Sequence, residues 1–589
     1  MSESPVDSVI TPVKELLAVD LFVDGAGRLG KLSYLLDPAL GAKVGDCLKV
    51  PFGKRELTAT FLGPATDPSK AKREVLSIVG ARTSEDILRV CSELSDRHIS
   101  PETSIYPRLA PTRYIDSEPA EFGAPALAPG VAKRVPPRPD RSVAGRFVSN
   151  RQLWITDPLV EAADAAALAA MEIVTKNDAA QVLVLAPTEK MVTAILARFI
   201  TGAARLDTRA KSGAYTAFTA GSLQVGIATR SAALYLAKNL AGVVIAQEEH
   251  PGHIEATAPY THVREVADLR TKNSLSLTII SSNPSVQAIT MGMSIMRVGS
   301  EKYWPKISLI TRVAPELDSS DPAIAHLKAL DAHATLSGAL PPLLRRSFLP
   351  YQLTKAIVEA NRAGITPYVL VQSSPAKRRC VGCGALSACP WCSLSTCEHK
   401  ENIDPCPRCK SVGARMTGWD ASRVENLFAG SVKAVTYKEL SELSGVEVLI
   451  IFDADAISLV STPIRGDFFI SVLLTAMHSL AANGKLLVCA DNLTDPVIRA
   501  LVTENDLPGV ARIRYNQAKA DNLPPFGNLI TVTSAHNFKT DNWPGRVHGP
   551  SKVGANWEAV LRCDNTELLV LKPILKKLLA RGKSRVRVN

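Results

Sequence analysis

The chain has 589 residues, enough for roughly three to five domains, and 46% of them are hydrophobic while 21% are charged. This composition excludes a single small module and a disordered chain. Lys and Arg number 68 against 57 Asp and Glu, a net charge of +11 that favours a polyanionic partner. No run of 18 apolar residues and no secretory signal pattern occurs, so we expect no membrane segment and a cytoplasmic location.

Short alternating apolar segments separated by turn residues predict a small β-rich domain at the N-terminus, over residues 1–106, with a helix over 84–99. The following residues, 107–145, are rich in proline and predict an extended, semi-rigid linker.

Beyond the linker, continuous Val/Ile/Leu runs alternate with helical stretches, which predicts two lobes with parallel sheets over 146–345 and 346–507. The C-terminal residues, 508–589, predict an α+β domain with strands over 528–534, 560–563 and 567–571 and a helix over 572–582.

A cysteine cluster within the second lobe, over 378–412, predicts structural zinc. It holds three CxxC pairs and one further cysteine: Cys380, Cys383, Cys389, Cys392, Cys397, Cys406 and Cys409. A CxxC turn presents two thiolates on one side, and two such turns complete a tetrahedral site. We expect two zinc ions per chain, with the last donor of the second site left open, His399 being one candidate.

The two lobes suggest an ATP-driven motor, yet three parts of its chemistry are missing. No glycine lies between residues 146 and 201, so no phosphate-binding loop can form there. The apolar run over 239–246 leads into Gln247-Glu248-Glu249-His250, with a neutral side chain where magnesium needs an acid. No arginine occurs between 465 and 499 to serve as an arginine finger. We therefore predict no ATP hydrolysis.

Five segments in order, VPFGKR, LVLAPTEKMVTAILARF, VGIATRSAALYLAKNLAGVVIAQEEH, the zinc knuckles and DNLPPF, resemble the PriA family of primosomal replication-restart proteins across nearly the whole chain. The resemblance implies a multidomain α/β fold. Its parts would be a β-rich N-terminal DNA-binding domain that holds a 3′ end, two degenerate helicase-like parallel-sheet lobes, a zinc-knuckle insertion and an α+β C-terminal domain. The missing motifs are similar to those of actinobacterial-type members regarded as lacking helicase activity.

The resemblance also implies ligand sets for zinc and a departure at the end-binding site. The first and last CxxC pairs would share one ion, and the middle pair and Cys397 would hold the second. Ser33 stands where the family has an Asp, beside Tyr34. Ser282-Asn283-Pro284 lies where the family has a Ser/Ala-Thr-Pro motif.

Candidate DNA contacts lie near both ends of the chain. Lys54 and Arg55 follow an expected turn, where a solvated loop and a phosphate contact are equally good interpretations. Six bases without an acid occur between 576 and 587, and such a run can displace counterions from DNA. The candidates are Tyr34, Lys49, Lys54, Arg55, Lys583, Arg585 and Arg587. His250, His253 and His262 have no metal-ligand spacing and are expected to be ordinary histidines.

The leading hypothesis is a replication-restart protein that recognises forked or branched DNA and directs primosome assembly without helicase activity. By resemblance its partners would be primosome proteins, the replicative helicase and single-strand-binding protein, with no membrane. One alternative is an active ATP-dependent 3′–5′ DNA helicase with an atypical nucleotide site. Another is a zinc-dependent interaction scaffold that does not bind DNA.

Overall fold

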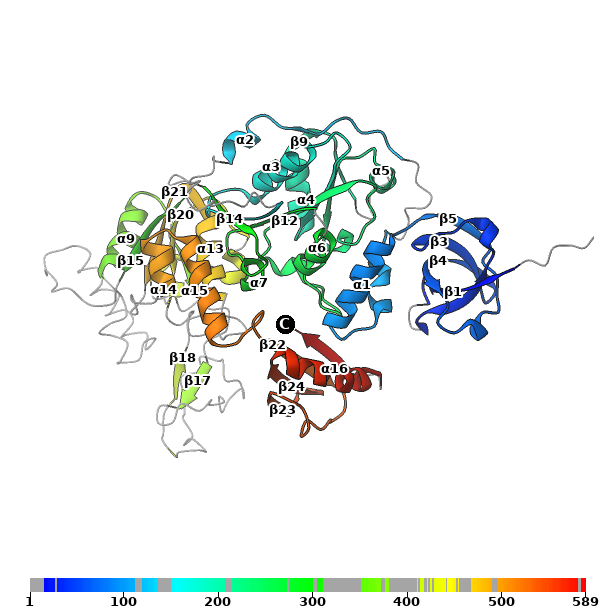
Figure 1. The fold of residues 1–589 in the computed structure, drawn as a ribbon. Helices are drawn as coiled ribbons and strands as arrows, with labels where there is room; N and C mark the ends of the chain where they lie inside the picture. Colours follow the sequence, from blue (N-terminus) through cyan, green and yellow to red (C-terminus); the bar gives the residue numbers. More distant parts are fainter. Residues whose placement is uncertain are drawn as a thin grey trace, which may run out of the picture. The chain divides into compact units, whose positions relative to one another are not determined.

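The structure is a computed structural model. It describes residues 15–26, 29–111, 119–135, 150–206, 213–272, 275–299, 304–310, 351–371, short stretches between 377 and 454, 468–489, 496–580 and 584–588. The chain forms two compact units: unit 1 comprises residues 1–155, 161–296 and 515–589, and unit 2 comprises 156–160 and 297–514. The fold is multidomain α/β, with parallel sheets and antiparallel β-rich regions (Figure 1).

The N-terminal part of unit 1 is an antiparallel five-stranded sheet in the order β2-β1-β4-β3-β5. Its strands are β1 (Leu17–Val23), β2 (Leu32–Leu36), β3 (Asp46–Phe52), β4 (Arg55–Pro64) and β5 (Ser77–Ala81). Alternate residues such as Leu21, Leu48 and Ala59 are fully buried in its core. Helix α1 (Glu85–Arg97) follows, with the Ser84 hydroxyl accepting a hydrogen bond from Ile87 N.

A seven-stranded sheet in the order β10-β11-β8-β12-β13-β7-β14 forms the next part of the chain. Its strands are β7 (Arg151–Thr156), β8 (Gln181–Ala186), β10 (Ala203–Arg205), β11 (Val225–Thr229), β12 (Leu240–Ala246), β13 (Ser276–Ser281) and β14 (Ser294–Val298). Strands β10, β11, β8, β12, β13 and β7 pair in parallel. Residues 181–186 are all buried, as expected for a strand covered on both faces. Helices α3 (Ala162–Val174), α4 (Glu189–Leu196), α6 (Val263–Thr271) and α7 (Val286–Ile289) belong to this part.

Part of the proline-rich segment is packed, where its composition predicted an extended linker. Strand β6 (Ala126–Leu127) pairs with β9 (Phe199–Thr201), and helix α2 (Val131–Arg134) follows. The Arg134 side chain donates two hydrogen bonds to Asp164, at 2.6 and 2.9 Å. Backbone pairing, this ion pair and the buried side chains of Val131 and Val135 therefore hold the segment.

Unit 2 contains a five-stranded parallel sheet in the order β15-β21-β20-β16-β19. Its strands are β15 (Lys306–Ile310), β16 (Tyr368–Val371), β19 (Lys433–Thr436), β20 (Val446–Ile451) and β21 (Leu480–Cys489), and its helices include α9 (Tyr351–Arg362) and α13 (Phe468–Ser479). The predicted zinc insertion begins and ends in a strand pair, because β17 (Lys377–Cys380) is antiparallel to β18 (Ala414–Thr417).

The C-terminal residues form an antiparallel sheet in the order β23-β24-β22-β25, with helix α16 on one face (Figure 1). Its strands are β22 (Asn528–Ser534), β23 (Arg546–Val553), β24 (Asn556–Cys563) and β25 (Ser584–Val588). The strand predicted over 567–571 is wrong, since α16 covers Asn565–Ala580. Asp564 and Glu567 form a reciprocal capping box, with N–O distances of 2.8 and 2.9 Å, which starts the helix before the leucines.

Helix α1 connects three parts of unit 1. Lys272 Nζ lies 3.3 Å from Glu93 Oε2, and His98 Nε2 lies 2.5 Å from Glu265 Oε2, so α1 is joined to α6. Ile99, 1% exposed, belongs to the hydrophobic core between the C-terminal sheet and α16. The C-terminal core is therefore completed by a residue from the N-terminal half of the chain.

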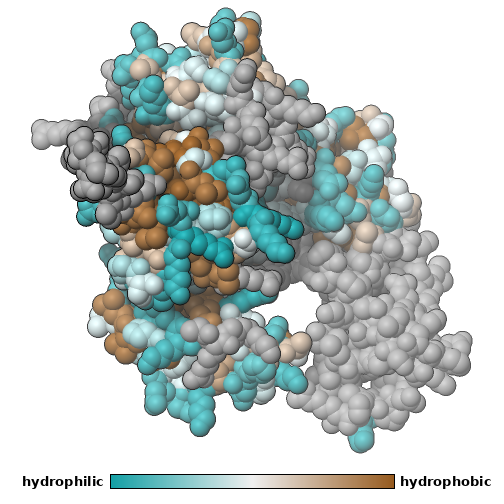
Figure 2. Space-filling view, turned by 90° about the vertical axis from the view of Figure 1, so that its right-hand side faces the viewer, coloured by the Kyte–Doolittle hydropathy of each residue, from teal (hydrophilic) through white to brown (hydrophobic). Residues whose placement is uncertain are grey.

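Hydrophilic and hydrophobic side chains are interspersed on the face shown in Figure 2. Large apolar side chains reach the surface at Ile200, Leu569 and Val570. Among the described residues, no helix combines the length and the apolar character needed to cross a membrane.

Candidate functional site

The carboxyl end of β12 carries the segment in which the sequence predicts a degenerate magnesium site. Gln247 has a left-handed backbone, with φ of 52°, and its neutral amide cannot replace a metal-binding carboxylate. The two glutamates that follow are held by side chains from β13, α6 and α7. These glutamates could bind a metal ion only if their carboxylates were not already held by groups of the chain.

Glu248 is fully buried and forms an ion pair with Arg264 of α6. It also accepts hydrogen bonds from Ser285 N at 3.0 Å and from Ser285 Oγ at 2.6 Å, and Arg264 donates to Ser285 Oγ at 2.8 Å. Burial alone would raise the pKa of Glu248, but the Arg264 guanidinium and the other polar neighbours lower it to about 2. The carboxylate is thus charged and its acceptor sites are used by the protein.

The carboxylate of Glu249 is likewise occupied by hydrogen bonds, here from residues at the end of β13. Its Oε2 accepts from Ser281 Oγ at 2.7 Å, and its Oε1 accepts from Ser282 N at 3.2 Å and Ser282 Oγ at 2.7 Å. Ser282 is the first residue of the Ser-Asn-Pro segment, which lies where the resembled family has a Ser/Ala-Thr-Pro motif. This segment therefore contacts the residues that follow β12.

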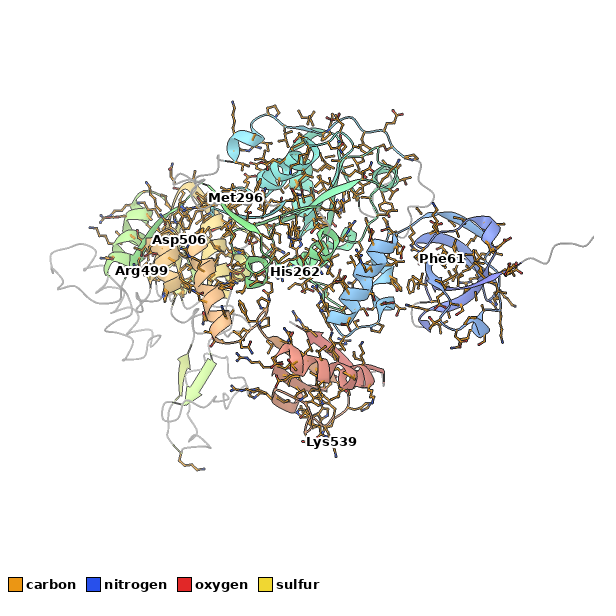
Figure 3. The ribbon with its side chains drawn as sticks, viewed as in Figure 1. Phe61, His262, Met296, Arg499, Asp506 and Lys539 are labelled. Carbon is orange, nitrogen blue, oxygen red and sulfur yellow. The ribbon has the colours of Figure 1, made fainter. Side chains whose placement is uncertain are left out.

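The sequence predicted surface or loop histidines here, but His253 is fully buried, and His250 and His262 are half-buried. His253 Nε2 lies 2.8 Å from Ala246 O, and burial lowers the pKa of His253 to about 4. His262, labelled in Figure 3, precedes α6 and its Nδ1 accepts from Arg264 N at 3.0 Å. The His253 and His262 rings lie 5.9 Å apart. Burial also lowers the pKa of His262, so both rings are neutral at pH 7.

The connection from β7 to α3, where a phosphate-binding loop is expected in a motor, is acidic. Asp157 is fully buried, accepts from Arg297 Nε at 2.7 Å and packs so closely on Gly299 that a Cβ there would lie 2.0 Å from its Oδ2. Burial raises the pKa of Asp157, and the bond from Arg297 opposes this rise.

The start of α3 itself is occupied by further acidic side chains. Asp164 of the first turn is buried, accepts from Arg134 and also accepts from Arg198 Nε at 2.6 Å. Glu161, the residue before the helix, pairs with Arg198 as well. A helix N-terminus normally favours an anion, but this one is already surrounded by carboxylates of the chain.

The predicted N-terminal DNA contacts do not form one group. Lys54 and Arg55 are exposed at the β3–β4 turn, where Gly53 has a φ of 63°. Lys49 lies beside them on β3, with its Nζ 2.6 Å from Glu56 Oε2. Tyr34 is only 4% exposed and its hydroxyl donates to Pro51 O at 3.1 Å, so its ring is part of the core.

Ser33, the departure noted in the sequence, has a partner on the neighbouring strand. Its hydroxyl donates to Asp20 Oδ1 at 2.8 Å, and Asp20 Oδ2 accepts from Thr66 N and Oγ1 at 3.0 and 2.7 Å. Both oxygens of this buried carboxylate are therefore used within the sheet.

The C-terminal candidates lie on one face of a sheet. Val586 is buried under α16, so Arg585 and Arg587 point to the opposite face and are exposed. Register places residues from three other strands on that face, which we call the basic sheet face: Thr531, Thr533, Arg546, His548, Glu558, Arg562, Arg585 and Arg587. Lys583 lies outside the described residues.

The charge of the basic sheet face is not neutralised within the described part of the chain. Its four guanidinium groups form no ion pair with a described carboxylate, and Glu558 is its single acid. Arg587 lies over the Tyr260 ring, 5.8 Å from its centroid. Arg546 and Arg562 were not predicted from the sequence. The alternation of apolar and polar residues along β24 was the signal that could have indicated them.

The predicted zinc ligands are not tested by these observations. Cys383, Cys389, Cys392, Cys397, Cys406 and Cys409 lie outside the described residues, as does His399, and only the backbone of Cys380 is described. In the described ranges, no three His, Cys, Asp or Glu side chains are grouped to hold a metal ion. The β17–β18 pair places Cys380 opposite Ala414, which brings the two ends of the insertion together.

Comparisons with known proteins give only distant likenesses. No family model and no curated protein matches the chain. Two crystal structures of the DUF1998 helicase MrfA, one bound to DNA and one bound to DNA and AMPPNP, are 10% identical, with TM-scores of 0.29 and 0.26. The matches cover 65% and 68% of this chain and 54% and 55% of those chains, so the chain spans about half the length of each.

Proposed function

We propose that the chain is a DNA-binding protein that recognises forked or branched DNA and does not hydrolyse ATP. The observation that carries this proposal is the basic sheet face, where four arginines meet one carboxylate on the face of the sheet opposite α16. Guanidinium groups bind phosphates with paired donors, and threonine hydroxyls add neutral donors beside them. The exposed Lys54 and Arg55 at the N-terminal turn supply a second, separate basic element.

The absence of ATP hydrolysis is supported by the use of the carboxylates at the lobe edge. Magnesium would have to displace Arg264 and Ser285 from Glu248, or two serines from Glu249. Phosphates would approach a helix start that already has Glu161 and Asp164 beside it. The occupied glutamates leave no free carboxylate for magnesium, and the acidic residues at the start of α3 would repel the phosphates of a nucleotide.

We further propose a role in replication restart, with the fork held by the chain while primosome proteins and the replicative helicase assemble. Support for this finer role is the resemblance of the sequence to the PriA family. The same resemblance supports two zinc ions, one held by the first and last CxxC pairs and one by Cys389, Cys392, Cys397 and a further donor. Zinc would supply folding energy to the insertion, since thiolate sites contribute about 10–16 kcal/mol.

Fluorescence anisotropy with a fork, a plain duplex and a single strand of equal length, across a range of salt, tests the proposal. We expect tighter binding to the fork, and at least tenfold weaker binding by Arg585→Glu/Arg587→Glu. The matched control is Lys539→Glu/Lys552→Glu, which makes the same charge change in the same domain at exposed positions off the basic sheet face. Equal affinity for fork and duplex would exclude structure recognition, and equal weakening by both double variants would exclude the basic sheet face.

A further inference from the structure

Unit 1 contains a small pocket that the proposed function does not use. It lies between α1, the turn at 106–108, the residues after β11 and the start of α6, and it has an apolar wall. Its polar lining consists of Arg108, Arg230, Ser231, His253, Glu255 and Thr261. Two cationic side chains thus face one carboxylate in a small pocket that opens to solvent at the exposed Ser231.

Arg108 is the group most in need of a partner. Its side chain is 18% exposed, and within the described residues its guanidinium makes no hydrogen bond. Its nearest charged neighbour is Glu255, with NH2 3.7 Å from Oε2, too far for a hydrogen bond. Burial lowers the pKa of Arg108, an effect that an anion in contact would reverse. A guanidinium carries five donors, and here they open onto the pocket.

Arg230 is only partly satisfied. One of its nitrogens donates to Gly252 O at 2.8 Å, while its Nε lies 3.5 Å from Glu255 Oε2. The carboxylate therefore lies between two guanidinium groups and closely bonds neither. The pocket keeps an excess of positive charge and several unused N–H groups.

The neutral groups of the pocket define the ligand more narrowly. His253 is fully buried, and its Nε2 must carry the hydrogen because Ala246 O can only accept, which leaves Nδ1 as an acceptor with no partner. Ser231 and the 4% exposed Thr261 bring hydroxyl donors. A ligand that fits has several acceptor oxygens for the arginines and hydroxyls, and one O–H for His253.

We propose that this pocket binds a phosphoryl group in its monohydrogen or dihydrogen form. Such a group supplies acceptor oxygens for Arg108, Arg230, Ser231 and Thr261 and a P–OH for His253 Nδ1. Its source is either inorganic phosphate or the terminal phosphate of a DNA strand. Only the second source rests on the proposed DNA-binding function.

Isothermal titration of the full chain with inorganic phosphate, and with a short single-stranded oligonucleotide with and without a 5′-phosphate, tests this assignment. Arg108→Gln removes the least satisfied cation, and Thr261→Val removes one hydroxyl while nearly preserving its shape. Arg89→Gln is the matched control, because Arg89 is an exposed arginine of α1 that pairs with Asp86 outside the pocket. Thermal melting establishes that each variant is folded.

We expect saturable binding of one phosphate per chain, weakened at least tenfold by Arg108→Gln, several-fold by Thr261→Val and not at all by Arg89→Gln. A preference for the phosphorylated oligonucleotide that Arg108→Gln abolishes identifies DNA as the source; binding of inorganic phosphate alone identifies the free ion. No saturable binding of either, or equal binding by Arg108→Gln and wild type, overturns the proposal. If Arg108→Gln does not fold, Thr261→Val decides. Fork binding that depends on Arg585 and Arg587 is measured separately, so either proposal can fail alone.

Discussion

The buried pair of Glu248 and Arg264 gives the sharpest test of whether the edge of β12 is structural. Arg264→Met keeps most of the side-chain volume and removes the charge that faces a carboxylate with no solvent exposure. Glu248 would keep its bonds from Ser285 but lose its ion pair. We expect unit 1 to be destabilised strongly by this single change.

The magnitude follows from the pKa of Glu248, which the folded protein lowers from an ordinary 4.5 to about 2. A shift of this size corresponds to roughly 3 kcal/mol. Removing one partner of a buried ion pair typically costs about 3–5 kcal/mol. The second figure is the one expected for Arg264→Met at pH 7, because the net pKa lowering of Glu248 also includes the opposing effect of burial and the bonds from Ser285.

The second substitution Glu248→Gln should recover most of that loss. It removes the unpaired buried charge and keeps an oxygen to accept from Ser285. Arg270→Met is the matched control, because Arg270 is a half-buried arginine of the same helix that, among the described residues, donates to the carbonyls of Ala233 and Tyr235. Glu248→Gln should not rescue Arg270→Met, since Arg270 has no carboxylate partner there.

The pH dependence has a definite sign. The pKa of Glu248 is lowered in the folded state, so its contribution is fully present above about 4.5 and is lost as pH falls towards about 2. The stability gap between wild type and Arg264→Met should narrow as the pH falls from 4.5 towards 2. Hydrogen exchange of peptides spanning residues 243–285, with guanidinium melts, measures the local and global free energies. A loss below 1 kcal/mol, or no rescue by Glu248→Gln, would refute the structural interpretation.

Further predictions concern ATP, DNA, the C-terminal core and zinc. Labelled ATP should not turn over above a heat-killed control, with or without forked DNA; turnover would support the helicase alternative. Arg585→Glu/Arg587→Glu should reduce the slope of log affinity against log salt by about 1.8, two phosphate contacts at 0.9 each. Ile99→Ala should destabilise the C-terminal core by about 2–5 kcal/mol, seen as faster exchange in β22 and β24. Plasma mass spectrometry should find two zinc ions per chain and one in Cys397→Ser.

Local pattern was sufficient to predict the elements whose burial is continuous. The runs over 181–187, 223–229 and 446–455 contain the parallel strands β8, β11 and β20, because apolar residues without alternation can be satisfied only between two covering layers. The segment over 567–571 has the same apolar character and is helical. Its capping box outweighs strand propensity, and Leu571 and Leu575 then lie four residues apart on the buried side.

The site residues that the sequence did not reveal depend on long-range register. Arg546 and Arg562 are directly opposite on β23 and β24, so sixteen residues of sequence separate two neighbours on the basic sheet face. Arg108 and Glu255 come from segments far apart in the chain. The spacing of charged residues along the sequence predicts which side chains lie together only when all of them lie on one helix or strand. Arg585 and Arg587 on β25 are such a case.

The arginines described above are of two kinds, and this difference links the two halves of the proposed function. Near the lobe edge, Glu248, Asp157 and Asp164 each have an arginine of the chain as partner. The arginines of the chain therefore neutralise the carboxylates that would otherwise bind a metal with its nucleotide. We expect ATP with magnesium not to raise the melting temperature. The arginines of the basic sheet face form no ion pair with a described carboxylate. The positive charge of these arginines has to be neutralised by an external polyanion. Forked DNA should therefore raise the melting temperature in the same experiment, whereas ATP should not.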